Sequence, residues 1–127
     1  MNYKVVRQNK TNLPTYGKYR AVAIHEQTVT QRDVEEEIQA NCSAKASDVK
    51  LVLTELASSL ALHLKKGDKV VLERLGTLKL EIESRAVDSE NAFNAGEHIK
   101  GVRLHFIPES YRGRQDMYQD IHYHKSK

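Results

Sequence analysis

Residues 64–83, with the sequence LKKGDKVVLERLGTLKLEIE, decide the fold of this 127-residue chain. A helix is expected to end at Lys65-Lys66-Gly67, because cations suit the negative end of a helix dipole and glycine readily takes a positive φ. A strand follows over Lys69–Leu72, and residues 73–77 form a turn. From Leu78 to Glu83 apolar and charged residues alternate strictly, which predicts a strand with one buried face. The stretch therefore predicts a helix leading into a β-hairpin.

A first helix is expected well upstream of this stretch, beginning at Thr30. Its hydroxyl can accept a hydrogen bond from the amide of Asp33, whose carboxylate suits the positive end of the dipole. One stripe of this helix comprises Val34, Ile38 and Cys42. We expect Cys42 to be a small buried side chain at the helix end. As the single cysteine of the chain, it excludes an internal disulfide framework and a multi-cysteine zinc site.

A second helix is expected from an N-cap at Ser47 to about Lys66. Its main apolar face comprises Val49, Val52, Leu53, Leu56, Leu60 and Leu64. Leu51 and Leu62 lie on another side, so this helix must be covered on more than one side. In a chain of this length, we expect a second subunit to cover the other apolar side of this helix.

The segment after the hairpin is polar and then becomes apolar again. Residues 84–101 are rich in turn-forming residues, and Val102–Ile107 is expected to be a third strand that ends at Pro108. A short helix is expected from Glu109 to Ile121. Its residues available for packing are Tyr111, Met117, Tyr118 and Ile121.

The first 27 residues are expected to form an extension with two short strands, around Val5-Val6 and Ala21–Ile24. A loop containing Asn12, Pro14 and Gly17 separates them. Tyr16 and Tyr19 alternate with Lys18 and Arg20, a mixture that can stack on nucleic-acid bases. We expect packing of these tyrosines against the main domain as their principal role.

The net charge of +3 is unevenly distributed along the chain. Residues 1–26 carry +4, residues 27–83 carry −2, residues 84–101 carry −1 and residues 102–127 carry +2. Solvated surface charge explains such a distribution, and a polyanionic partner is an alternative that needs further support.

Several functional classes are excluded by what the sequence lacks. It has no apolar run near the roughly 20 residues that span a bilayer, and no sustained apolar segment at its N-terminus. It has no glycine-rich phosphate loop, no nucleotide fingerprint, and no serine or cysteine nucleophile with a convincing base. We therefore expect a cytoplasmic protein that is not an enzyme and has no cofactor.

The order of expected elements resembles the HU and integration-host-factor family of bacterial histone-like DNA-binding proteins. Lys66–Leu72 is similar to the family's helix-to-strand junction, and Leu75-Gly76-Thr77-Leu78 to its Gly-Phe-Gly-Thr-Phe turn. The spacing of Pro108, Gly113 and Arg114 matches the family's Pro-x-x-x-x-Gly-Lys pattern at the last helix. This likeness covers residues 28–121. Segments that resemble the extended HU-related proteins of the Bacteroides group are Tyr3–Val6, Tyr19–Val22 and Ile99–Arg103.

The resemblance implies an α+β fold with two N-terminal helices, a three-stranded antiparallel sheet with a β-arm, a short C-terminal helix and an intertwined dimer. It divides the chain into an N-terminal extension (1–27), an HU-like DNA-binding domain (28–121) and a C-terminal tail (122–127). In this family two β-arms enter the minor groove and bend the duplex. The residues it places at DNA phosphates are Arg74, Lys79, Arg85, Lys100, Arg103, Arg112 and Arg114.

The expected arm departs from the family pattern. Residues 84–101 contain no proline to intercalate, and their net charge is −1. Ala92 or Phe93 is a candidate wedge, and Phe93 folding back onto the body is the alternative. Either the arm is short and does not embrace DNA, or binding uses the basic N-terminal extension instead. We expect weak, salt-sensitive and sequence-tolerant binding without sharp kinking.

The expected function is that of a dimeric, nucleoid-associated architectural protein whose partners are double-stranded DNA and a second copy, with no membrane or small-molecule substrate. The alternative is an HU-fold dimer that acts as a protein–protein interaction module with weak or no DNA binding, using the N-terminal strands as an edge. A third interpretation is an enzyme with a metal held by His122 and His124 together with His98 or His105. The resemblance implies no metal.

Overall fold

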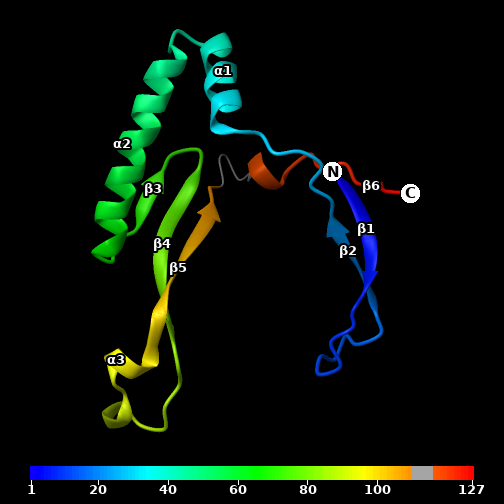
Figure 1. The fold of residues 1–127 in the computed structure, drawn as a ribbon, viewed down its shortest axis with the longest axis vertical. Helices are drawn as coiled ribbons and strands as arrows, with labels where there is room; N and C mark the ends of the chain where they lie inside the picture. Colours follow the sequence, from blue (N-terminus) through cyan, green and yellow to red (C-terminus); the bar gives the residue numbers. More distant parts are fainter. Residues whose placement is uncertain (110–115) are drawn as a thin grey trace.

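The computed structural model describes residues 1–109 and 116–127. It is an α+β structure with a pair of helices and two three-stranded sheets, of strand order β3-β4-β5 and β2-β1-β6 (Figure 1). The helices and the sheet β3-β4-β5 form a body, from which a long two-stranded arm extends. The sheet β2-β1-β6 stands apart as a second limb (Figure 1).

Helix α1 (Gln31–Asn41) begins as expected. Thr30 Oγ1 accepts from the backbone N–H of Asp33, and Asp33 Oδ2 accepts from the backbone N–H of Thr30 at 2.9 Å. This capping box satisfies two amides that the first turn otherwise leaves without partners.

Helix α2 (Ala46–Lys65) begins one residue before Ser47, so the expectation that Ser47 caps it is wrong. Asp48 Oδ2 accepts from the backbone N–H of Lys45 at 3.1 Å, and Gln39 Oε1 accepts from that of Ala46 at 2.7 Å. Side chains from α1 and from the first turn of α2 therefore perform the capping. Ser47 is left inside the helix.

The junction after α2 has the expected form. Gly67 has φ +92°, its N–H donates to Leu64 O, and the N–H of Asp68 donates to His63 O. These bonds terminate the helix and lead into β3 (Val70–Leu72), which pairs antiparallel with β4 (Gly76–Ser84). Glycine is required at position 76, because a Cβ there would meet the carbonyl of Ile107 and the ring of Phe106.

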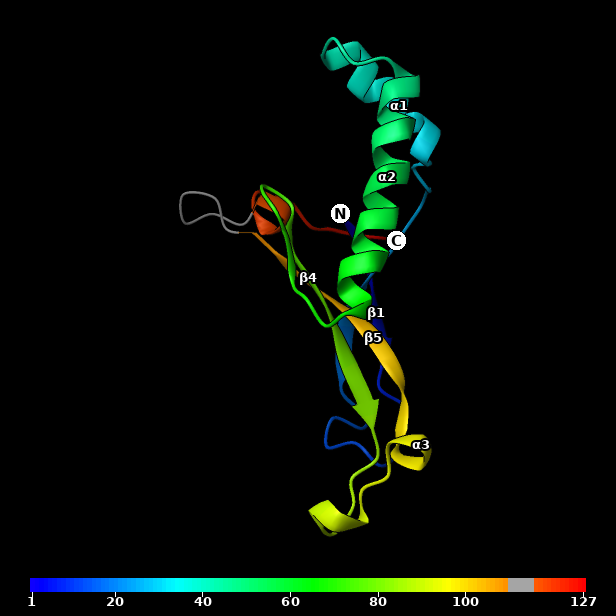
Figure 2. The ribbon, with the colours of Figure 1, turned by 90° about the vertical axis from the view of Figure 1, so that its left-hand side faces the viewer.

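Strands β4 and β5 (Ile99–Pro108) form an antiparallel ribbon longer than the sequence indicated. The extra pairing continues the ribbon beyond the body as a long arm, so the alternative of a short arm is wrong (Figure 2). Its end is not a simple turn but holds a 3₁₀ turn, η1 (Glu90–Ala92), and a short helix, α3 (Ala95–His98). A shift of register between Glu83 and Ser84 interrupts the pairing near this end.

The two expected strands near the N-terminus are present as β1 (Asn2–Arg7) and β2 (Tyr19–Ala23), which pair antiparallel as a hairpin. Strand β6 (His124–Lys125) pairs parallel with β1, so the two ends of the chain share one sheet. The expected packing of Tyr16 and Tyr19 against the main domain is wrong. Their exposed fractions are 50% and 70%, because the hairpin stands away from the body.

The C-terminal helix expected over 109–121 is not continuous in its described part. Residues Asp116–Tyr118 form only a 3₁₀ turn, η2, and no regular element follows until β6. Met117 and Tyr118 are exposed rather than packed. Tyr111 lies outside the described residues.

One chain encloses almost no core. Among the described residues, the buried hydrophobic side chains are Val49 and Leu64 alone. Leu51 and Leu62, on the second side of α2, are 62% and 57% exposed. The accessible surface is 10928 Å², whereas a compact monomer of this mass exposes about 6,900 Å². Both the projecting limbs and the uncovered apolar surface contribute to this excess.

Two smaller findings concern Cys42 and membranes. Cys42 is exposed, so the expectation of a buried thiol is wrong; its Sγ donates to Ile38 O at 3.2 Å, because the residue ends α1 at the surface. Over 1–109 and 116–127, no helix combines the length and apolar character that crossing a membrane requires.

Candidate nucleic-acid interface

Apolar and polar side chains alternate along β4 and β5, and the register of the two strands places like residues opposite each other. The β4–β5 ribbon therefore has one apolar and one polar face. The apolar face pairs Leu78 with Phe106, Leu80 with Leu104, and Ile82 with Val102. The polar face pairs Lys79 with His105 and Glu81 with Arg103. Cross-strand neighbours on one face lie about 5 Å apart at Cβ. The ribbon therefore brings predicted phosphate-binding residues and carboxylates together.

Glu81 lies at the centre of the charges on the polar face. Its Oε2 is 3.4 Å from Arg103 Nη2, and its Oε1 is 3.8 Å from Lys79 Nζ and 3.9 Å from His105 Nδ1. Glu83 Oε1 lies 4.0 Å from Arg103 Nε. These partly exposed pairs are individually weak. They nevertheless place negative charge where a phosphate has to approach, so Lys79 and Arg103 are partly neutralised.

Arg85 and Lys100 lie further along the arm, and both are exposed. In the part of the chain that the structure describes, neither forms an ion pair. The backbone N–H of Arg85 donates to His98 O at 2.8 Å, which fixes the end of β4. Glu83 pairs with Gly101 and Ser84 with Ile99, so Lys100 is the extra residue of a β-bulge. Bulges redirect side chains, and this one separates Lys100 from the charges around Glu81.

Arg74 occupies the turn between β3 and β4, at the opposite end of the ribbon. It has φ +69°, and its backbone N–H donates to Glu109 Oε2 at 2.8 Å. Since β4 has nine residues, Arg74 and Arg85 are separated by about 30 Å of strand. The predicted cations therefore do not form a single site but follow the length of the ribbon. Arg112 and Arg114 lie outside the described residues.

The tip of the arm is organised around His98. Its ring lies 5.5 Å from that of Phe93 between centroids, and its Nδ1 accepts from the backbone N–H of Asn94 at 2.8 Å. Phe93 thus packs within the tip, far from the body, and the alternative that it folds back is wrong (Figure 2). It remains 41% exposed, and Ala92 is exposed beside it.

The acidic residues between the predicted cations are the part of this site that sequence reasoning missed. The alternation from Leu78 to Glu83 placed Lys79, Glu81 and Glu83 on one face. It did not reveal that Arg103 and His105 share that face, because this depends on the register across the arm. The register between β4 and β5 can be assigned once the position of the bulge at Lys100 is known.

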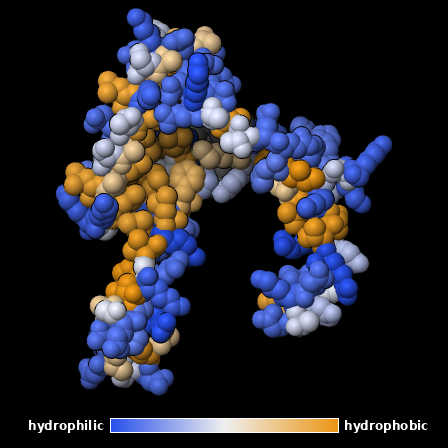
Figure 3. Space-filling view, viewed as in Figure 1, coloured by the Kyte–Doolittle hydropathy of each residue, from blue (hydrophilic) through white to orange (hydrophobic). Residues whose placement is uncertain are grey.

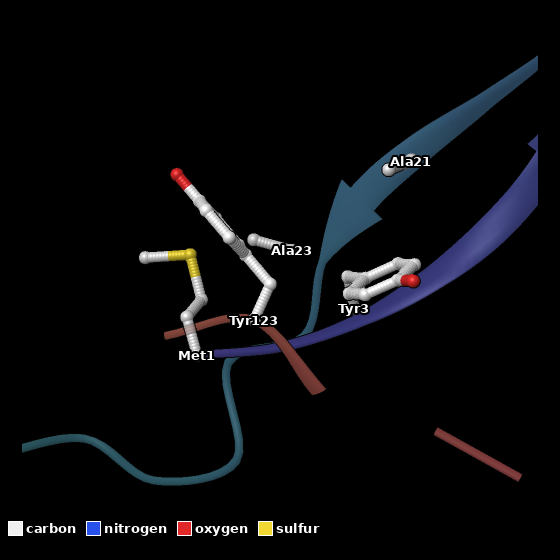
Figure 4. Close-up of a pocket in the computed structure, with 5 residues that line it drawn as sticks. All are labelled: Met1, Tyr3, Ala21, Ala23 and Tyr123. Atoms are coloured by element: carbon white, nitrogen blue, oxygen red, sulfur yellow. The ribbon is translucent and has the colours of Figure 1, made fainter. Parts of the chain in front are cut away.

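A hollow of about 440 Å³ lies on the other limb, on one face of the sheet β2-β1-β6 (Figure 4). The residues that line it are Met1, Tyr3, Ala21, Ala23 and Tyr123. No charged side chain lines it. Within 1–109 and 116–127, no three His, Cys, Asp or Glu side chains gather closely enough to hold a metal ion, and the tail histidines join no such cluster.

The chain matches one protein-family model and resembles several solved structures. Residues 1–121 match the HU-HIG family model, described as "HU domain fused to wHTH, Ig, or Glycine-rich motif". A crystal structure of a "Putative bacterial DNA binding protein" from Bacteroides vulgatus ATCC 8482 covers 98% of this chain with a TM-score of 0.62 and 11% sequence identity. The chain spans 47% of that protein's length, and the likeness concerns the fold alone. No curated protein matches the sequence.

Proposed function

Because the chain belongs to the HU-HIG family of HU domains, we propose that it is a dimeric architectural protein that binds duplex DNA with little sequence specificity. Its partners are double-stranded DNA and a second copy of the chain, and its place is the nucleoid. No catalytic step is part of this role. The similar protein from Bacteroides vulgatus, described as DNA-binding, supports the same class of partner.

The observation that carries the proposal is the projecting β4–β5 ribbon with exposed Arg85 and Lys100 along it (Figure 2). A two-stranded β-ribbon fits a groove of B-DNA, and cations along it contact the phosphates on either side. Such contacts fix position on the duplex without reading bases, which makes binding tolerant of sequence.

The uncovered apolar surface supports pairing with a second copy. Leu51 and Leu62 of α2 are largely exposed, as are Ile82 and Val102 on the apolar face of the ribbon. Hydrophobic side chains gather over α2 and the sheet of the body in Figure 3. Surfaces of this kind mark association sites in soluble proteins. Pairing of two chains through them supplies the core that one chain lacks.

The proposal is tested by fluorescence anisotropy with two unrelated duplexes of about 30 bp, over about 50 to 300 mM KCl. We expect log K to fall linearly with log[salt], with the same slope for both duplexes, because phosphates provide the contacts. Absence of salt-dependent binding to either duplex contradicts the proposal.

The alternative of a protein–protein interaction module is favoured by one observation. Glu81 and Glu83 partly neutralise Lys79 and Arg103, and the arm itself carries −1. This alternative predicts no binding to either duplex at physiological salt, together with a stable dimer. The same salt series therefore separates the two functions.

A further inference from the structure

The hairpin formed by β1, β2 and the connecting loop of residues 8–18 is the most one-sidedly charged segment of the chain. Its cations are Lys4, Arg7, Lys10, Lys18 and Arg20, and all five are exposed. No Asp or Glu occurs in residues 1–25. We name this segment the basic hairpin. In the N-terminal 26 residues the one carboxylate, Glu26, accepts from Asn2 Nδ2 at 2.7 Å, at the root of the hairpin away from its loop.

The cations of the basic hairpin differ from those of the ribbon in their surroundings. On the ribbon, Lys79 and Arg103 both lie within 4 Å of Glu81. Among the described residues, no carboxylate lies within ion-pair distance of any of the five hairpin cations. A phosphate that approaches the hairpin has no negative charge to displace, so each contact there keeps its full counterion-release contribution.

The loop of the hairpin is ordered by its own hydrogen bonds. Gln8 N–H donates to Lys18 O at 2.8 Å, and Gly17 N–H donates to Gln8 O at 3.0 Å. The Arg7 guanidinium lies 5.6 Å from the centre of the Tyr16 ring. The backbone at Lys10 and Lys18 is thus held near the strand ends that carry Arg7 and Arg20, so little backbone entropy is lost when the loop binds.

The position of the hairpin matches that of the arm. In Figures 1 and 2 both limbs extend from the same side of the helical body. The loop of the hairpin and the tip of the arm thus lie on the same side of the helices.

We propose that the basic hairpin is a second binding element for duplex DNA, which contacts phosphates through Lys10, Lys18 and Arg20 and supplies more of the salt-dependent affinity than the acidic arm. This inference rests on the proposed function and adds the segment that dominates binding. It involves phosphates rather than base edges, so it adds affinity without sequence preference.

The test compares three variants of the full chain that each lose three positive charges. The hairpin variant is Lys10→Gln/Lys18→Gln/Arg20→Gln, and the ribbon variant is Arg85→Gln/Lys100→Gln/Arg103→Gln. The control variant, Arg32→Gln/Lys45→Gln/Lys50→Gln, changes exposed residues of α1 and the start of α2. Far-ultraviolet circular dichroism checks that each variant is folded.

We expect the hairpin variant to bind a duplex about tenfold or more weakly than wild type, and its salt slope to fall by about 2 to 3 for each bound chain. The control variant keeps the wild-type slope, and the ribbon variant loses less than the hairpin variant. A hairpin variant that retains the wild-type slope overturns the inference while the proposed function stands. A wild-type chain that binds no duplex overturns both.

Chemical modification of the wild-type chain tests the basic hairpin independently of the variants. Acetic anhydride acetylates exposed lysines, and bound DNA is expected to protect Lys10 and Lys18 while Lys50 stays reactive. Equal reactivity of the three lysines with and without saturating DNA contradicts the inference. The binding assay is repeated with duplex RNA to test the partner. If the hairpin variant loses binding to RNA but keeps its binding to DNA, a DNA-binding role of the basic hairpin is contradicted.

Discussion

At the scale of single residues, two glycines differ in why they are needed. Gly67 has φ +92° and open space where a Cβ would stand, so only backbone strain opposes a side chain. At Gly76 a Cβ would meet the Ile107 carbonyl and lie 2.8 Å from the Phe106 ring. The first position ends a helix, and the second allows β4 and β5 to approach.

We therefore expect Gly76→Ala to lower the free energy of unfolding by about 3 kcal/mol, against about 1 kcal/mol for Gly67→Ala. Urea denaturation of both variants measures the difference. Equal losses would show that the close approach of Gly76 to the Ile107 carbonyl carries no cost of its own.

The capping box of α1 makes part of the stability depend on pH. Hydrogen bonds from the Thr30 backbone N–H and then from its hydroxyl lower the pKa of Asp33 from its usual value of 3.8. A carboxyl with a depressed pKa in the folded state stabilises the fold above its unfolded pKa, and this stabilisation is lost as the pH falls through the folded value.

Asp33→Asn is therefore expected to be less stable than wild type at pH 7, and the difference is expected to shrink as the pH falls below 3.8. Urea denaturation across this range checks the trend, with Glu37→Gln on the outer face of α1 as the control. A difference that is the same at pH 7 and at pH 3 would refute the role of the charged Asp33.

At the scale of elements, the β4–β5 ribbon carries cations that are proposed to bind phosphates and carboxylates that partly neutralise them. Glu81 contacts Lys79, Arg103 and His105 across two strands. Removing its charge leaves the cations in place and removes the competitor of the phosphate. Under the proposed function, the charge balance of this one element thus limits how strongly the arm binds DNA.

Glu81→Gln is expected to tighten duplex binding by roughly threefold to tenfold and to steepen the salt slope by about 1. Anisotropy measures both quantities, and Glu37→Gln, with the same change of net charge on α1, is the control. If both substitutions tighten binding equally, net charge rather than the ribbon explains the effect.

Most elements could be predicted from the sequence because their signals are local. Thr30 and Asp33 indicated the start of α1, Gly67 indicated the end of α2, and alternation indicated β4. The resemblance to the HU family is confirmed by the family match. The expectation that Ser47 caps α2 was wrong, because a carboxylate at Asp48 and an amide at Gln39 cap this helix. The expected C-terminal helix does not extend over residues 116–121, which hold only a 3₁₀ turn.

The candidate site was less predictable because it depends on contacts between distant segments. The pairing of Glu81 with Arg103 requires the register across the arm, and that of β6 with β1 joins the two ends of the chain. The roles of the seven predicted cations and the division into extension, domain and tail remain predictions.

At the scale of the whole molecule, one chain leaves many large hydrophobic side chains exposed. Val71 and Leu104 are 66% and 53% exposed, in addition to the residues of α2. A fold whose core is completed by a second copy has a stability that depends on protein concentration.

The midpoint of urea denaturation is therefore expected to rise with chain concentration between about 1 and 100 μM. Circular dichroism at both concentrations measures it. A midpoint that stays constant over this range would mean that one chain folds alone, and the proposed dimer would lose its physical basis.

Sedimentation equilibrium of the full chain in the absence of DNA distinguishes the proposed dimer from a monomer. At concentrations of about 10 μM, well above the dissociation constants of obligate dimers, we expect one folded species with twice the mass of the chain. A single species with the mass of one chain, folded by circular dichroism, would contradict the proposed dimer.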